Sequence, residues 1–200
     1  MTGQGQYSFR SWQTEHGLPA NLVRSIVQAA DGHLWIATAE CIARFDGIQF
    51  ERIELPEDFP YPHTGKSRLF ATSEGAVWFS SSKGGLLRIE GSSMRVVFPD
   101  HQEGESPQFT QLIESPAGGV IALRGNEVWK ITAKGTELRT PPDPADLATL
   151  RADAEKRNRE GRIGPDGMPG SPWDCCYLDR SGSDDGGLLV NTSEGLKRWI

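Results

Sequence analysis

The sequence predicts an all-β fold: a β-propeller of four-stranded antiparallel blades, in an incomplete ring of about four blades. Three observations predict it. A glycine-containing turn followed by an apolar strand recurs at a step of 43 residues. Each recurrence is followed by a tail in apolar, variable, basic, apolar order. Finally, 23 Gly and 13 Pro in 200 residues favour turns over helices.

The repeat is visible in four copies. The first, Asp31–Thr38 (DGHLWIAT), recurs as Glu74–Ser81 (EGAVWFSS) and as Ala117–Leu123 (AGGVIAL), in which Ile121 replaces the tryptophan. A fourth copy, Asp185–Thr192 (DGGLLVNT), comes 68 residues after the third, which is one period plus an insertion. A period of ~40 to 45 residues with short strands is typical of propeller blades and excludes helical solenoids.

Each copy divides into short strands and tight turns. In the first copy we expect strands at Val23–Gln28, Leu34–Thr38, Ile42–Phe45 and Gln49–Ile53. The first and third of the turns between them contain Asp-Gly pairs, Asp31-Gly32 and Asp46-Gly47, because glycine adopts positive φ without steric cost. One such blade cannot bury both of its faces, so neighbouring blades must cover each other.

The whole chain is therefore interpreted as one partial propeller. Its repeat units lie near residues 20–54, 64–98, 108–140 and 173–200, and residues 141–172 form an insertion of helix and loop. Asp143 and Pro144 suit a helix start and Gly161 a helix end. We expect a solvated decoration here, and a lid or partner-binding arm is the alternative. A ring of four copies also suggests an N-terminal fragment or truncated product of a longer receptor.

Composition excludes several classes of partner. A formal charge of -6 leaves no basic excess for nucleic acid. No apolar run is long enough to span a membrane, and Met1–Tyr7 lacks the features of a secretory signal. The three cysteines, Cys41, Cys175 and Cys176, do not suggest a disulfide framework.

No local motif indicates catalysis, a metal or a cofactor. Thr64–Ser67 (TGKS) lacks the earlier glycine of a phosphate-binding loop. A calcium loop starting at Asp179, with Ser181, Ser183 and Asp185 as further ligands, would need a glutamate at its twelfth position, which is Val190.

The histidines and tryptophans have structural interpretations as well. His16, His33, His63 and His101 lack metal-ligand spacing. Trp35 and Trp78 occupy equivalent repeat positions and are expected to pack between blades. Trp12, ahead of the first blade, is expected to be freer and to have some chance of contacting a ligand.

The first copy resembles a known family. Trp12–Pro19 (WQTEHGLP), the LWIAT strand and Ala43–Gly47 (ARFDG) are similar to the two-component regulator propeller repeat, found in sensor domains of bacterial hybrid histidine kinases and related receptors. Cys41 departs from the family's usual glycine, and the later copies lack the Gly-Leu-Pro element.

The resemblance implies a non-catalytic, periplasmic sensor module that binds an unknown small molecule or glycan. Such a module signals to a downstream histidine kinase or diguanylate cyclase domain that this chain does not contain, and meets the membrane only through a missing anchor. It requires no cofactor, and the sequence assigns no ligand-binding residue. The alternatives are a propeller lyase or hydrolase, for which the fold gives precedent, and a protein-interaction scaffold.

Overall fold

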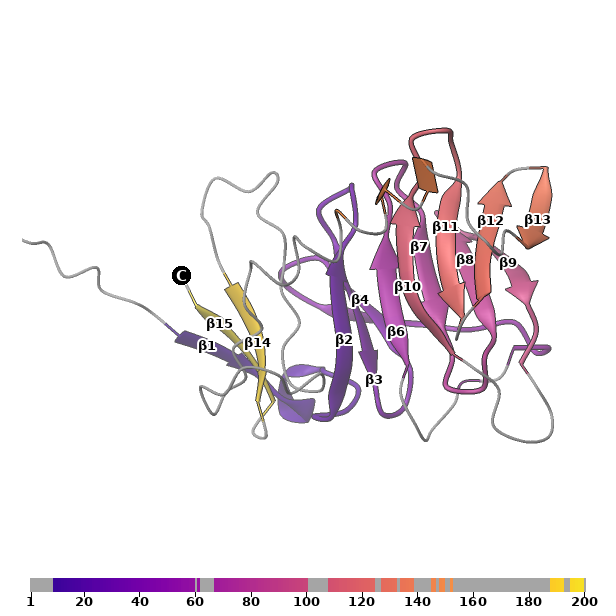
Figure 1. The fold of residues 1–200 in the computed structure, drawn as a ribbon. Helices are drawn as coiled ribbons and strands as arrows, with labels where there is room; N and C mark the ends of the chain where they lie inside the picture. The colour runs from indigo at the N-terminus through magenta and orange to yellow at the C-terminus, as the bar shows by residue number, and fades with distance from the viewer. Residues whose placement is uncertain are drawn as a thin grey trace, which may run out of the picture.

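The computed structural model consists of four antiparallel sheets. It describes residues 9–59, 61, 67–100, 108–124, 127–132, 134–138, 145–146, 148–149, 152, 188–192 and 195–199. Figure 1 shows the sheets one after another along the molecule. Three of them have four strands, each paired with the next in sequence order, as predicted for propeller blades.

The first blade contains β2 (Val23–Gln28), β3 (Leu34–Thr38), β4 (Ile42–Phe45) and β5 (Phe50–Ile53). Its predicted strands are confirmed to within one residue. A 3-10 turn, η1 (Thr14–His16), precedes it. The turn before β3 requires glycine, because Gly32 has a φ of 85°.

The next two blades repeat this plan. The second contains β6 (Arg68–Ala71), β7 (Val77–Ser80), β8 (Leu86–Glu90) and β9 (Ser93–Phe98). The third contains β10 (Phe109–Glu114), β11 (Val120–Arg124), β12 (Glu127–Thr132) and β13 (Gly135–Leu138). The turns that lead into β7 and β11 again contain positive-φ glycines, as the repeat predicts.

The fourth sheet joins distant parts of the chain. It has the order β1-β15-β14 and consists of β14 (Leu188–Thr192), β15 (Gly195–Trp199) and the N-terminal strand β1 (Phe9–Trp12). In the antiparallel pairing of β1 and β15, Phe9 lies opposite Trp199. Sequence analysis assigned no strand to residues 9–12, because a pairing between opposite ends of the chain has no local signal.

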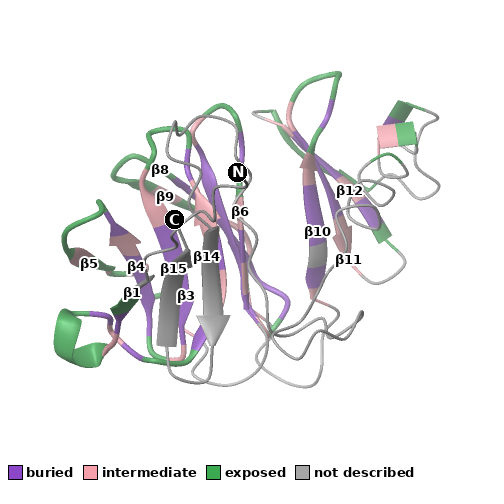
Figure 2. Ribbon diagram, turned by 90° about the vertical axis from the view of Figure 1, so that its left-hand side faces the viewer, coloured by how far each residue is buried: buried purple, intermediate pink, exposed green. Residues whose placement is uncertain are grey.

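Apolar side chains fill the spaces between neighbouring blades. One cluster joins the first and second blades, with Trp35 and Ile42 packed on Val77 and Phe79. Another joins the second and third blades and includes Trp78 and Phe109. Buried segments therefore run along the strands, as Figure 2 shows. The predicted packing of Trp35 and Trp78 between blades is confirmed, since both are at most 5% exposed.

The expectation that Trp12 is free is wrong. Its side chain is 5% exposed and belongs to a cluster with Leu18, Ile26 and Phe45. The Trp12 and Phe45 rings meet edge to face, with centroids 5.3 Å apart. Trp12 therefore packs against the first blade and the segment that precedes it, and little of its side chain is left exposed.

The described part of the insertion starts as a helix packed on the third blade. Ala145, Asp146, Ala148, Thr149 and Ala152 are helical. The prediction of a solvated segment is wrong at Asp146, which is only 2% exposed. The predicted capping residues, Asp143, Pro144 and Gly161, lie outside the described residues. No helix in the described part of the chain is long and apolar enough to cross a membrane.

Candidate functional site

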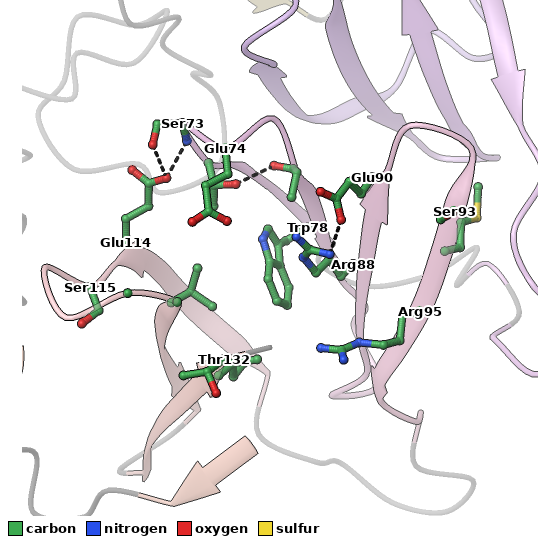
Figure 3. Close-up of a pocket in the computed structure, with 17 residues that line it drawn as sticks. Ser73, Glu74, Trp78, Arg88, Glu90, Ser93, Arg95, Glu114, Ser115 and Thr132 are labelled. Carbon is green, nitrogen blue, oxygen red and sulfur yellow. Dashed lines mark hydrogen bonds and ion pairs between the residues drawn. The ribbon is translucent and has the colours of Figure 1, made fainter. Parts of the chain in front are cut away.

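A cleft of about 580 Å³ separates the second and third blades on one face of the molecule. Its walls come from the β6–β7 turn, β7, β8 and β9 on one side, and from the β10–β11 turn, β11 and β12 on the other. Figure 3 shows polar side chains from both blades around this space. The cleft borders the apolar cluster that joins the two blades, since Ala76, Trp78, Val120 and Ile131 belong to both.

Trp78 provides a buried polar group in the lining of the cleft. The residue is 3% exposed, yet its indole Nε1 has no hydrogen-bond partner among the described residues. A buried N–H without an acceptor costs free energy that a bound acceptor would recover. Trp78 therefore marks where a ligand oxygen would be stabilised.

Two arginines lie side by side on the wall formed by the second blade. Arg88 on β8 is directly opposite Arg95 on β9 in the strand register. Arg88 lies over the Trp78 ring, 5.8 Å from the centroid, and forms an ion pair of 2.5 Å with Glu90. Arg95 is exposed and has no ion pair or hydrogen bond within the described part of the chain. Like charges directly opposite each other destabilise a sheet.

Three carboxylates surround the arginines. Glu90 is engaged by Arg88. Glu114 on the opposite wall accepts hydrogen bonds from the backbone N–H and the hydroxyl of Ser73, the latter at 2.7 Å. Glu74, in the β6–β7 turn, is exposed and forms no ion pair or hydrogen bond with the described residues. Counting only the described residues, the cleft therefore presents one unengaged cation, Arg95, and one unengaged anion, Glu74.

A buried polar network borders the cleft on the third blade. Lys130 on β12 forms an ion pair with Asp146 of the insertion, with Nζ and Oδ1 3.2 Å apart. The hydroxyl of Ser115, which lines the cleft, donates to the same carboxylate oxygen at 3.0 Å, and Lys130 also donates to Ser115. The insertion is thereby attached next to the cleft wall.

A second, smaller cavity of about 270 Å³ lies beside Cys41 and Tyr61. The Tyr61 hydroxyl donates to the Thr38 carbonyl at 2.6 Å. Burial raises the pKa of both the Cys41 thiol and the Tyr61 hydroxyl above their usual values. Both groups are therefore neutral at physiological pH, so neither of them places a charge in the cavity.

The other motifs weighed in the sequence contribute nothing to the cleft. His16 accepts a hydrogen bond from the Gln13 backbone within the 3-10 turn, and His33 lies beside Asp31 in the β2–β3 turn. His63 and His101, most of Thr64–Ser67 and the stretch from Asp179 to Asp185 lie outside the described residues. The described residues contain no cluster of three His, Cys, Asp or Glu able to hold a metal.

Sequence analysis missed the cleft residues. Arg88 was recognised as the basic residue of the repeat tail, but Arg95 stands in a strand with no conserved-looking pattern between copies. Arg95 could have been found as the residue opposite the tail's basic residue on the neighbouring strand. That assignment requires knowing how β8 and β9 are aligned.

One family model matches the chain. Residues 17–40 match the two component regulator propeller, which is the segment from the end of η1 to the turn after β3. The resemblance seen in the sequence is therefore confirmed for the first blade. No curated protein matches the chain.

Several solved structures share the fold. Virginiamycin B lyase from Staphylococcus aureus with quinupristin has a TM-score of 0.50 and 16% identity over 96% of this chain. The chain spans 59% of that structure's length. The selenomethionine form of the lyase gives a TM-score of 0.50 and 14% identity, covering 96% of this chain and 74% of the lyase.

A receptor domain is also similar. The extracellular domain of the putative hybrid two component system BT3049 from B. thetaiotaomicron gives a TM-score of 0.45 and 15% identity, covering 96% of this chain and 30% of that domain. Identities this low establish the fold alone. From the sheets, the fold match and the family match together, this chain is a β-propeller whose first blade contains a two component regulator propeller repeat.

Proposed function

We propose that the chain is the ligand-binding sensor module of a bacterial signal-transduction receptor, and that its ligand binds in the cleft between the second and third blades. The observation that carries the signalling role is the two component regulator propeller repeat at residues 17–40. The unpartnered indole N–H of Trp78 supports the choice of cleft, because a buried donor stabilises a ligand acceptor.

In this proposal the module lies outside the cytoplasmic membrane and is not an enzyme. Ligand binding favours one relative position of the second and third blades over others, since both blades contribute walls to the cleft. A histidine kinase or diguanylate cyclase domain of the intact receptor then reads that change. The module recognises its ligand and releases it chemically unchanged.

The test is a thermal-shift screen of the full chain against sugars, short peptides and small acids. A ligand present at 100 times its Kd adds about 2.7 kcal/mol, which raises the melting temperature by roughly 5 to 10 °C in a domain of this size. Mass spectrometry of the recovered ligand separates sensing from enzymatic turnover. Chemical conversion of the ligand would favour the lyase or hydrolase alternative.

Two matched variants locate the site. Trp78→Phe removes the indole N–H in the cleft, whereas Trp35→Phe makes the same change at the equivalent position of the first blade, which faces the second blade. We expect weaker binding only in Trp78→Phe. Equal affinities in the two variants would place the ligand elsewhere, and a screen without any saturable ligand would contradict the sensor role.

A further inference from the structure

The three blades differ at one cross-strand pair, and the difference falls in the cleft. In the first blade the basic residue of the repeat tail, Arg44, lies opposite Glu51, and the two form an ion pair of 2.7 Å. In the third blade Lys130 lies opposite Glu137. Of the three four-stranded blades in the described part of the chain, only the second places a cation, Arg95, opposite the basic residue of the tail, Arg88. The fourth sheet also pairs two arginines, Arg10 and Arg198, but neither of them lines the cleft.

A like-charged pair at this position opposes folding, because the two guanidinium groups repel each other. Glu90 engages Arg88 only, so Arg95 keeps an unneutralised charge. A protein retains such a pair at low cost when a bound anion neutralises it. The natural anion for a planar guanidinium is a carboxylate, which accepts two parallel hydrogen bonds from it.

The surroundings of Arg95 set limits on that anion. Figure 3 shows Trp78 between Arg95 on β9 and Glu74 in the β6–β7 turn, all three on the wall that the second blade contributes to the cleft. Three carboxylates line the walls, so a doubly charged phosphate would be repelled. A single carboxylate is tolerated, and Glu74 stabilises a positive group at the other end of the same ligand.

We infer that the cleft recognises a small zwitterion, a molecule with one carboxylate and one ammonium group such as an ω-amino acid or a short peptide. Its carboxylate binds Arg95, one ligand oxygen accepts the Trp78 N–H, and its ammonium group faces Glu74. This inference rests on the proposed function, since it names the ligand class of the proposed sensor cleft.

The test uses isothermal titration calorimetry on the full chain at low salt. The probes are ω-amino acids of two to six carbons, glycylglycine and triglycine. Each is compared with the matching acid that lacks the amine, the matching amine that lacks the carboxylate, inorganic phosphate and a neutral disaccharide. We expect at least one zwitterion to bind about 10-fold or more tightly than either of its single-charge relatives.

Three variants assign the contacts. Arg95→Gln should weaken binding of that zwitterion about 10- to 100-fold. Glu74→Gln should weaken the zwitterion but leave the matching acid unchanged. Arg52→Gln is the control, because Arg52 is also an exposed arginine on the fourth strand of a blade, yet lies outside the cleft.

Arg95→Glu separates a binding role from a structural one. It restores the pairing of the first blade, so it should raise the melting temperature by roughly 1 to 3 °C while abolishing zwitterion binding. If Arg95 had only a structural role, Arg95→Glu would not combine a gain in stability with a loss of affinity for the zwitterion.

The possible failures are distinguishable. Binding of the disaccharide or of phosphate alone, abolished by Trp78→Phe, would overturn the zwitterion and leave the sensor cleft in place. Zwitterion binding that is unchanged in both Arg95→Gln and Trp78→Phe would overturn the site. Absence of binding by every probe would overturn the zwitterion inference, and the wider screen described above would then decide the sensor role.

Discussion

Breaking the buried ion pair between Lys130 and Asp146 should cost more stability than any surface pair of this protein. Lys130 has a side chain 11% exposed, and the Asp146 side chain is 2% exposed. Substituting Asp146→Leu keeps the branching of the side chain but removes the carboxylate, so it leaves the Lys130 ammonium buried without a counter-charge. Removal of one partner from a buried pair costs about 3 to 5 kcal/mol, and the residual exposure of Lys130 favours the lower end.

Lys130→Met is the second single variant of a double-mutant cycle on this ion pair. The single variant leaves the Asp146 carboxylate with the Ser115 hydroxyl as a remaining donor, so we expect a loss of about 2 kcal/mol. In the double variant, Lys130→Met with Asp146→Leu, neither charge remains to be buried. Its loss should be smaller than that of Asp146→Leu alone, giving a coupling energy of roughly 2 kcal/mol or more.

The assay is urea unfolding of the four proteins, followed by tryptophan fluorescence. The exposed pair of Arg52 and Glu54, with Nε and Oε1 3.6 Å apart, is the control and should show a coupling below about 0.5 kcal/mol. A coupling for Lys130 and Asp146 as small as that of the control would refute the reasoning. It would mean that the insertion does not depend on the buried pair for its attachment to the third blade.

Three further predictions follow from the core. Trp12→Ala should destabilise the chain by about 3 to 5 kcal/mol in urea unfolding, because Trp12 packs edge to face on Phe45; a loss below about 1 kcal/mol would show that β1 is not docked. Gly85→Ala should cost about 1 to 3 kcal/mol, since the new Cβ would overlap Asp100 Oδ1, and a neutral outcome would contradict that contact. Burial raises the pKa of the Cys41 thiol, so the native state holds its proton more tightly than the unfolded chain. Stability should therefore decline as pH rises through the unfolded thiol's pKa, about 8.5, and less steeply in Cys41→Ala, whereas identical pH profiles would argue against a buried thiol.

The attachment of the insertion changes how the cleft is understood. Ser115 both lines the cleft and bonds to Asp146, so the wall formed by the third blade and the insertion share one polar network. A ligand that moves the β10–β11 turn would therefore also disturb the docking of Asp146. This gives a sensor of this design a physical connection between the cleft and a segment outside the blades.

The repeat explains why the strands were predictable. Steps of 43 residues between equivalent glycines predicted the turns before β3, β7 and β11, and each of these turns has a positive-φ glycine. Trp35 and Trp78 were assigned to blade packing from their equivalent positions alone. A strand's apolar residues and its bounding turns are close in sequence, so local patterns report them.

The pairing partners were not predictable in the same way. Trp12 was expected to be free because its partner strand, β15, lies at the other end of the chain. The insertion was expected to be solvated because its charges are spaced like those of a surface helix, whereas Asp146 meets Lys130 in the interior. Each of these contacts joins residues that no local pattern relates.

The repeat pattern is enough to predict the blade: its four short strands, their turns and the apolar faces that a neighbouring blade must cover. Which charges meet depends on the folded chain, because a shift of one residue in the register between two strands moves every side chain to the other face of the sheet. Arg95 opposite Arg88, in a cleft that also holds the unpartnered Trp78 N–H, is a juxtaposition of that kind. The proposed ligand site of this propeller therefore rests on contacts that its repeat does not contain.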